Sequence, residues 1–174
     1  NRVNLSFKKG YEFPIWKPPV DEFINKNYKY SPVVIPQGLY WLIEGNLDFF
    51  RYENSDFQDL LQVKTGPKLI IGEFKDNFFD YTELSVTPRF RFNRGKSPFN
   101  FDQIVDNKVI ELKASQQIYG PLLVNFSAEI SLDKQESNND ALINPVLDLS
   151  WNRRAYSINL FYNIDSEVGG LNFK

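Results

Sequence analysis

The sequence contains no histidine and no cysteine among its 174 residues. Without histidine, the usual general base, the Ser-His and Cys-His dyads and the commonest metal ligand are missing. Without cysteine, thiolate nucleophiles, disulfides and soft-metal sites are excluded. Catalysis by carboxylates alone, as in glycoside hydrolases, is an enzyme class that this composition leaves open.

The sequence also lacks methionine, a strong net charge and any long apolar run. Its 20 Lys and Arg against 22 Asp and Glu give a net charge of −2, which does not favour a nucleic-acid partner. No apolar run approaches the roughly 18 residues of a transmembrane helix. A transmembrane β-barrel remains possible, because its signal is alternation and not bulk hydropathy. Since the chain starts at Asn1 without a signal peptide, we expect a processed or trimmed chain or a piece of a longer one.

Aromatic residues are abundant, with 3 Trp, 9 Tyr and 16 Phe, or 16% of the chain. Nevertheless, the mean hydropathy is −0.41, so these rings are interspersed with polar residues. Alanine, by contrast, is scarce. This combination is typical of β-structure.

Polar and apolar residues alternate with a period of two in several segments, and this pattern predicts strands and not helices. In residues 81–93, for example, Leu84, Val86 and Phe90 alternate with Ser85 and Arg89. The clearest segments of this kind are 81–93, 109–118, 122–133 and 156–164. Weaker ones are 40–52, 67–75, 141–151, a first strand near residues 3–8 and a last one at 171–174.

We therefore predict an all-β fold, an antiparallel long-stranded meander that forms a transmembrane β-barrel or part of one. Residues 1–36 are predicted to hold an N-terminal strand and a Pro-rich connection, with a short strand near Tyr28. Residues 37–174 are predicted to form the barrel, or a barrel fragment.

Strand length alone leaves a membrane barrel and a long, coiled soluble sheet equally open, and connection length favours the membrane barrel. Several predicted strands exceed the roughly 5–6 residues of a typical soluble strand and reach the about 9–11 needed to cross a bilayer. The predicted connections alternate between long (53–66, 94–108, 134–140) and short (76–80, 119–120, 152–154). In a meander this puts all long loops at one end, as in outer-membrane barrels.

Aromatic residues gather near the predicted strand ends, where a membrane barrel carries its aromatic girdles. Cross-strand packing within a sheet is the alternative interpretation. Pro88 and Pro145 lie inside predicted strands and conflict with a regular ladder. We expect a bulge or a displaced strand boundary at each.

Four basic residues, Arg89, Arg91, Arg94 and Lys96, form a run that leads into the 94–108 connection. Such a run could hold the phosphates of an anionic lipid or glycan, and we name these residues as the candidate contact to an anionic headgroup. The alternative is a solvated strand end balanced by Asp102 and Asp106. No catalytic, cofactor-binding or metal-binding residues are predicted.

Three stretches carry a resemblance to a known family: QGLYWLIEGNLDFFRY (37–52), KSPFNFDQIVDNKVIELKASQQIYGP (96–121) and YSINLFYNIDSEVGGLNFK (156–174). They resemble the C-terminal barrel region of a cyanobacterial outer-membrane family that is similar to LptD, the lipopolysaccharide-assembly (organic solvent tolerance) protein. The resemblance covers roughly residues 36–174. LptD barrels have many more strands than this chain, and their periplasmic jellyroll is absent here.

The resemblance implies a barrel in the cell outer membrane that delivers lipopolysaccharide or another glycolipid to the outer leaflet, without enzymatic activity or a cofactor. It implies three kinds of partner: the glycolipid, outer-membrane lipid and the proteins of a periplasmic transport bridge. Nucleic acid is not expected. No residue of this sequence matches a functional motif of that family, so no site residue follows from it.

Two other functions remain open from the residues themselves. A soluble β-barrel that binds lipid or has a structural role would cover the apolar strand faces with protein. A carboxylate-based glycan hydrolase would need two carboxylates about 5–10 Å apart in a cleft, and no spacing in the sequence selects such a pair.

Overall fold

The structure is a computed structural model of the whole chain. It describes residues 2–19, 35–53, 56–99, 107–133, 142–153 and 155–174. The strand predicted near Tyr28 lies outside these residues, as do Asp102 and Asp106.

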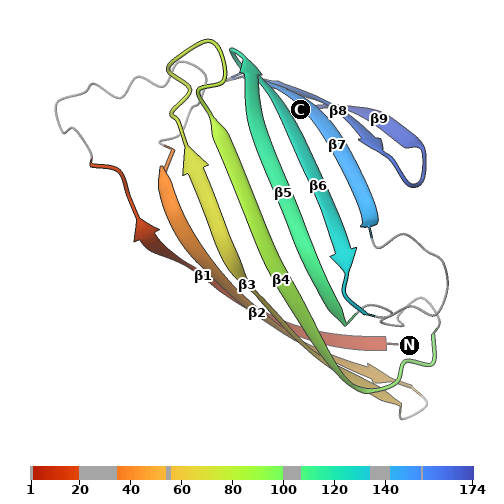
Figure 1. The fold of residues 1–174 in the computed structure, drawn as a ribbon. Coiled ribbons are helices and arrows are strands. Elements are labelled where there is room, and N and C mark those ends of the chain that lie inside the picture. Colours follow the sequence, from red (N-terminus) through yellow and green to blue (C-terminus); the bar gives the residue numbers. More distant parts are fainter. Residues whose placement is uncertain (1, 20–34, 54–55, 100–106, 134–141, 154) are drawn as a thin grey trace.

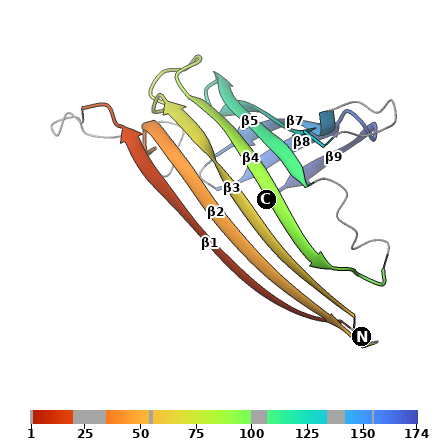
Figure 2. The ribbon, with the colours of Figure 1, turned by 60° about the horizontal axis from the view of Figure 1, so that its bottom comes forward.

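Nine strands form one antiparallel sheet in simple chain order (Figure 1). They are β1 (Arg2–Trp16), β2 (Gly38–Tyr52), β3 (Phe57–Ile71), β4 (Thr82–Gly95), β5 (Lys108–Tyr119), β6 (Leu122–Ser131), β7 (Leu142–Asn152), β8 (Ser157–Asn163) and β9 (Val168–Phe173). The predicted all-β antiparallel meander is therefore confirmed. The sheet coils, so that β7–β9 are turned relative to β1–β4 (Figure 2).

The sheet is not closed. Strands β1 and β9 are its two edges, and they run in the same direction because the chain reverses eight times between them. The described residues contain no helical segment with the length and apolarity that a bilayer crossing requires.

The predicted separation of long and short connections is wrong. Strand β3 begins at Phe57 and not near residue 67, so β2 and β3 are joined by residues 53–56 alone. The longer connections 72–81 and 96–107 follow consecutive strands and therefore lie at opposite ends of the sheet. The sequence pattern failed here because Asp59 lies on the same face as Leu61, where its charge interrupts the alternation. Arg51 on the neighbouring strand compensates that charge, with Nη1 2.5 Å from a carboxylate oxygen of Asp59.

Pro88 and Pro145 lie in strands, as predicted, and Pro14, which was expected in the Pro-rich connection, also lies in a strand. Each of the three coincides with an irregularity. Next to Pro145, the pairing of β6 with β7 shifts between Ser127 and Glu129, and Asn144 has a φ of 50°. Near Pro14, the pairing of β1 with β2 also shifts. A shift of this kind is a β-bulge, which accommodates a residue that cannot donate to the ladder. Around Pro88, the β3–β4 pairing is interrupted between Arg89 and Ser85 but resumes in the same register, and the β4–β5 register is unbroken, so the bulge or displaced boundary expected at Pro88 is not found.

Gly66 lies at that interruption and lets the two backbones approach closely. A Cβ atom built on Gly66 would lie 2.1 Å from the carbonyl oxygen of Val86. Gly45 on β2, by contrast, has no atom within 4 Å of its built Cβ. A side chain is therefore sterically excluded at Gly66, whereas there is room for one at Gly45.

We expect Gly66→Ala to lower the free energy of unfolding by roughly 1–3 kcal/mol, because β3 and β4 must separate to admit the methyl group. Gly45→Ala is the matched control and should be neutral or slightly stabilising, since the new methyl group meets open space and restricts the unfolded chain. Urea unfolding curves of the two variants measure the difference. Equal transition midpoints would show that the close approach at Gly66 has no energetic role.

Candidate functional site: the concave polar face

Exposure across the sheet is inverted relative to an ordinary soluble protein. On β4, Leu84 is 45% exposed and Phe92 60%, whereas Thr87 is 2% and Arg89 8% exposed. The buried apolar residues of the described chain are few: Tyr40, Tyr52, Ile70, Phe74, Val109 and Ala128. The sheet therefore buries polar side chains and presents apolar ones.

The apolar side chains form a continuous surface, called the outer face below. Strand register carries one row of it across the sheet: Trp16, Leu39, Leu69, Leu84, Ala114, Phe126, Leu147, Tyr162 and Gly169 are successive cross-strand partners. Because side chains alternate along each strand, the neighbours of this row in sequence point to the opposite face.

That opposite face is concave, which follows from ion pairs that skip a strand. Glu129 of β6 lies 2.6 Å from Arg89 of β4, across the intervening β5. Lys64 of β3 likewise forms an ion pair with Glu111 of β5. Strands two apart are separated by about 9.6 Å in a flat sheet, so these side chains must converge. The polar face is therefore the inside of the curve, and crowding there explains its burial.

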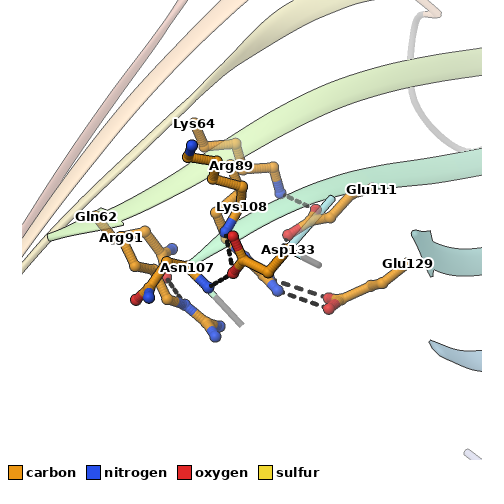
Figure 3. A network of polar contacts seen from close by, with 9 residues as sticks. All are labelled: Gln62, Lys64, Arg89, Arg91, Asn107, Lys108, Glu111, Glu129 and Asp133. Carbon is orange, nitrogen blue, oxygen red and sulfur yellow. Dashed lines mark hydrogen bonds and ion pairs between the residues drawn. The ribbon is translucent and has the colours of Figure 1, made fainter. Parts of the chain in front are cut away.

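Arg89 lies at the centre of this network (Figure 3). Its Nη1 donates to Glu111 at 2.7 Å, and its two terminal nitrogens bind both carboxylate oxygens of Glu129 at 3.0 and 2.6 Å. Lys64 is the second cation on Glu111. Because the Arg89 side chain is only 9% exposed, its charge must be paired in this way to be tolerated. We call Lys64, Arg89, Glu111 and Glu129 the central network.

Further polar contacts surround the central network on the same face. Arg91 donates from Nε to Gln62 at 3.1 Å. Lys68 lies 3.2 Å from Glu83. Lys113, by contrast, is exposed, two residues along β5 from the buried Glu111. The concave face thus carries both signs of charge, most of it paired.

At the β5–β6 turn end of this face, the Tyr81 hydroxyl donates to Glu83 at 2.5 Å. Burial, together with this hydrogen bond, raises the pKa of Tyr81, so its phenol stays protonated at ordinary pH. At the other end, the Asp133 carboxylate accepts hydrogen bonds from the backbone N–H groups of Asn107 and Lys108 (Figure 3).

The structure does not bring the four predicted headgroup contacts to one place. Arg89 and Arg91 lie on the concave face, where Arg89 is held by two glutamates. Arg94 pairs across from Asp59 and belongs to the outer face, near the end of β4. Lys96 follows the strand and is exposed. Their binding of an anionic headgroup stays a prediction.

Lys64 was missed because β3 was predicted to start after it. The alternation of polar and apolar residues on β5 and β6 is enough to place Glu111 and Glu129 on the same face as Arg89. Their pairing could not be predicted, since it depends on the register of four strands. Among the described residues, no three His, Cys, Asp or Glu side chains are grouped as a metal site would require.

We expect Arg89→Gln to lower the free energy of unfolding by roughly 3 kcal/mol, because it leaves two carboxylates crowded on a face with little water. Arg94→Gln removes the same charge from an exposed strand end and should change stability by less than about 0.5 kcal/mol. Urea unfolding of both variants gives the comparison. If Arg89→Gln unfolds at the same urea concentration as Arg94→Gln, the central network contributes nothing to stability.

Comparison with known proteins gives one finding on family. No curated protein and no solved structure gives a significant match to this chain. A family described as "Protein of unknown function (DUF3769)" matches residues 1–174. Since the match spans the chain, the protein belongs to the DUF3769 family.

Proposed function

We propose that this sheet is part of the wall of a β-barrel in an outer membrane. Its outer face would contact lipid, and its concave face would line a hydrophilic interior. The barrel would take part in the assembly or transport of lipopolysaccharide, or a similar glycolipid, to the outer leaflet, without covalent catalysis. The inverted exposure of the two faces is the observation that carries this proposal.

A soluble protein would need a second layer over the outer face. The described residues supply none, since their strands all belong to one sheet. Leaving Leu84, Phe92 and Leu160 between 45% and 60% exposed in water would forfeit most of the hydrophobic stabilisation. Lipid removes this penalty, because apolar side chains there meet acyl chains and not water.

The length of the apolar band agrees with a bilayer. On β2, the outer-face positions from Leu39 to Phe49 carry no charge. Ten residues of strand rise about 33 Å. With a tilt of about 40°, this corresponds to a height of about 25 Å, the height of the apolar band of outer-membrane barrels.

The ends of this band have the side chains expected at a membrane surface. At one end, the Arg51 guanidinium lies 6.0 Å from the Phe49 ring and 5.5 Å from the Phe57 ring. At the other, the Trp41 indole N–H donates to Thr65 at 2.8 Å. Aromatic rings beside polar groups suit the headgroup level, where one side of the ring is apolar and the other is wet.

Lys9 is an exception on the outer face of β1, opposite Gly45. A lysine at the bilayer midplane costs roughly 2–4 kcal/mol, so β1 would be covered here by further protein. Its open edge leads to the same conclusion, because unpaired backbone groups are not tolerated in lipid. Since β1 and β9 run in the same direction, an all-antiparallel barrel needs an odd number of additional strands between them.

The glycolipid part of the proposal rests on the resemblance of residues 37–52, 96–121 and 156–174 to the LptD-like family and on the charged concave face. A sugar headgroup with phosphates needs a polar path with accessible cations. Lys113 is such a cation, and Arg91 lies on the same face. Arg94 and Lys96, at the strand end, would meet anionic headgroups at the membrane surface.

Contact with lipid can be tested with single cysteines, because these 174 residues have none of their own. We expect a fluorophore on Phe90→Cys, on the outer face in the same cross-strand row as Val63 and Gly45, to be quenched by nitroxides in the middle of the bilayer. A fluorophore on Lys113→Cys, on the adjacent strand and the opposite face, should be quenched by a water-soluble agent instead. The protein is reconstituted in phosphatidylcholine vesicles for both measurements.

Two results would contradict this assignment. Equal quenching of both sites by the water-soluble agent would show that the outer face contacts water and not lipid. A protein that stays monomeric in buffer without detergent would favour a soluble lipid-binding or structural β-domain.

We expect Lys113→Glu to weaken binding of lipopolysaccharide about tenfold, the effect of losing one charge-assisted contact. Lys9→Glu makes the same change of charge on the outer face and should bind as the unmodified protein does. Titration of each reconstituted protein with fluorescent lipopolysaccharide measures both. Equal losses in the two variants would mean that net charge matters and the concave face does not.

A further inference from the structure

The connection between β3 and β4 exposes two adjacent aromatic rings. Phe78 is 62% and Phe79 63% exposed. Exposed pairs of this kind mark contact surfaces when their backbone is held in one conformation. In a flexible loop, by contrast, two exposed rings would not indicate a contact surface.

Residues 72–81 are held firmly, chiefly by Gln117 of β5, whose side chain is fully buried. Its amide nitrogen donates to the carbonyls of Asp76 and Gly120, at 3.0 and 2.8 Å. Its amide oxygen accepts from the backbone N–H of Asp80 at 2.9 Å. The N–H of Gly120 donates in turn to the carbonyl of Asn77 at 2.6 Å. The connection is thereby fixed to the β5–β6 turn.

The connection is also closed on itself. The Asp80 carboxylate accepts from the backbone N–H groups of Lys75 and Asp76, at 2.5 and 3.2 Å. The Phe74 ring is buried and stacks on Tyr81 with 4.4 Å between ring centroids. At its start, Gly72 has a φ of 88°, and a Cβ atom there would overlap the carbonyl oxygen of Asp80.

Two phenylalanines in this connection adopt left-handed backbone conformations, with a φ of 57° at Phe74 and 50° at Phe79. Bulky side chains rarely occur in this region, and the strain persists only where surrounding contacts enforce it. At Phe74 the strain accompanies burial of the ring. At Phe79 it accompanies exposure of the ring, which packing inside the protein does not explain.

The Phe78 ring continues the outer face beyond the strands. Phe78 lies 4.9 Å from Tyr119, centroid to centroid. Tyr119 pairs with Leu122, which pairs with Trp151 on β7, and the Arg153 guanidinium lies 5.2 Å from the Trp151 ring. The β3–β4 connection thus belongs to an aromatic margin of the outer face.

We propose that the β3–β4 connection is an interfacial anchor, with Phe78 and Phe79 inserted among the headgroups and upper acyl chains of a lipid bilayer. This inference rests on the proposed contact of the outer face with lipid and adds to it a preformed insertion element. The charged groups of the connection are compatible with this position: Asp80 caps backbone N–H groups, Lys75 pairs with Glu73, and Asp76 is exposed and would stay on the water side. Insertion is driven by the rings and should not require anionic lipid.

The test compares how deeply labelled positions of the reconstituted protein lie in the bilayer. A fluorophore is attached to Phe79→Cys, or to Phe78→Cys as a second variant. Its quenching is measured with a nitroxide on the lipid headgroup, with one at the middle of the acyl chain, and with one dissolved in water. Phe90→Cys and Lys113→Cys are the controls for the bilayer interior and the aqueous face. Vesicles of phosphatidylcholine, with and without phosphatidylglycerol, show whether charge contributes.

We expect a blue shift of emission at Phe79→Cys and loss of intensity with the headgroup nitroxide, with little loss from the mid-chain nitroxide, in both lipids. If Phe90→Cys is quenched by lipid but both Phe78→Cys and Phe79→Cys are quenched from water, the anchor is overturned while the outer face keeps its lipid contact. Shielding of these sites from all three quenchers would mean that protein covers them, which also overturns the anchor. Quenching of Phe90→Cys from water would overturn both proposals.

Discussion

The pairing of Arg89 with Glu111 and Glu129 is the interaction on which the rest of the structure depends. A single sheet without a covering layer has to satisfy its polar side chains from within one face. Arg89 reaches Glu129 across β5 only because the sheet curves toward that face. The same curvature spreads the outer face and separates its apolar side chains. Paired charges inside and exposed rings outside are therefore two results of one geometry.

Most of the fold could be predicted from alternation alone. The segments predicted at 81–93, 109–118, 122–133 and 156–164 correspond to β4, β5, β6 and β8 with small differences at their ends. The prediction failed where a residue contradicts the alternation but is compensated by a neighbour in space. Asp59 is acceptable on the outer face because Arg51 is its partner, and Pro14 is acceptable in β1 because the pairing shifts there. Such compensation depends on register, which a single sequence does not reveal.

The candidate site was predictable in its composition but not in its pairing. Alternation alone assigns Arg89 and Arg91 to one face and Arg94 to the other, because their positions differ in parity. The basic residues are neighbours in sequence, but the strand places them on two different faces. Sequence proximity suggested a cluster of free cations, whereas the structure gives Arg89 two carboxylates. A cation such as Lys113 stays accessible where no carboxylate from a neighbouring strand reaches it. Sequence alone does not show which side chains converge in this way.

Register is the constraint that joins fold and proposed function. A shift of β4 by one residue would turn Arg89 to the outer face and Phe90 to the concave one, so a charge would meet lipid and the central network would lose its centre. A regular ladder alone would penalise this shift weakly, because every backbone group would find a new partner. Gly66 and the prolines near it are position-specific, since the close approach to Val86 fits one alignment of β3 and β4. Gly66 and these prolines weaken the hydrogen-bonded ladder locally. By fixing the register, they also keep the outer face apolar and the concave face polar.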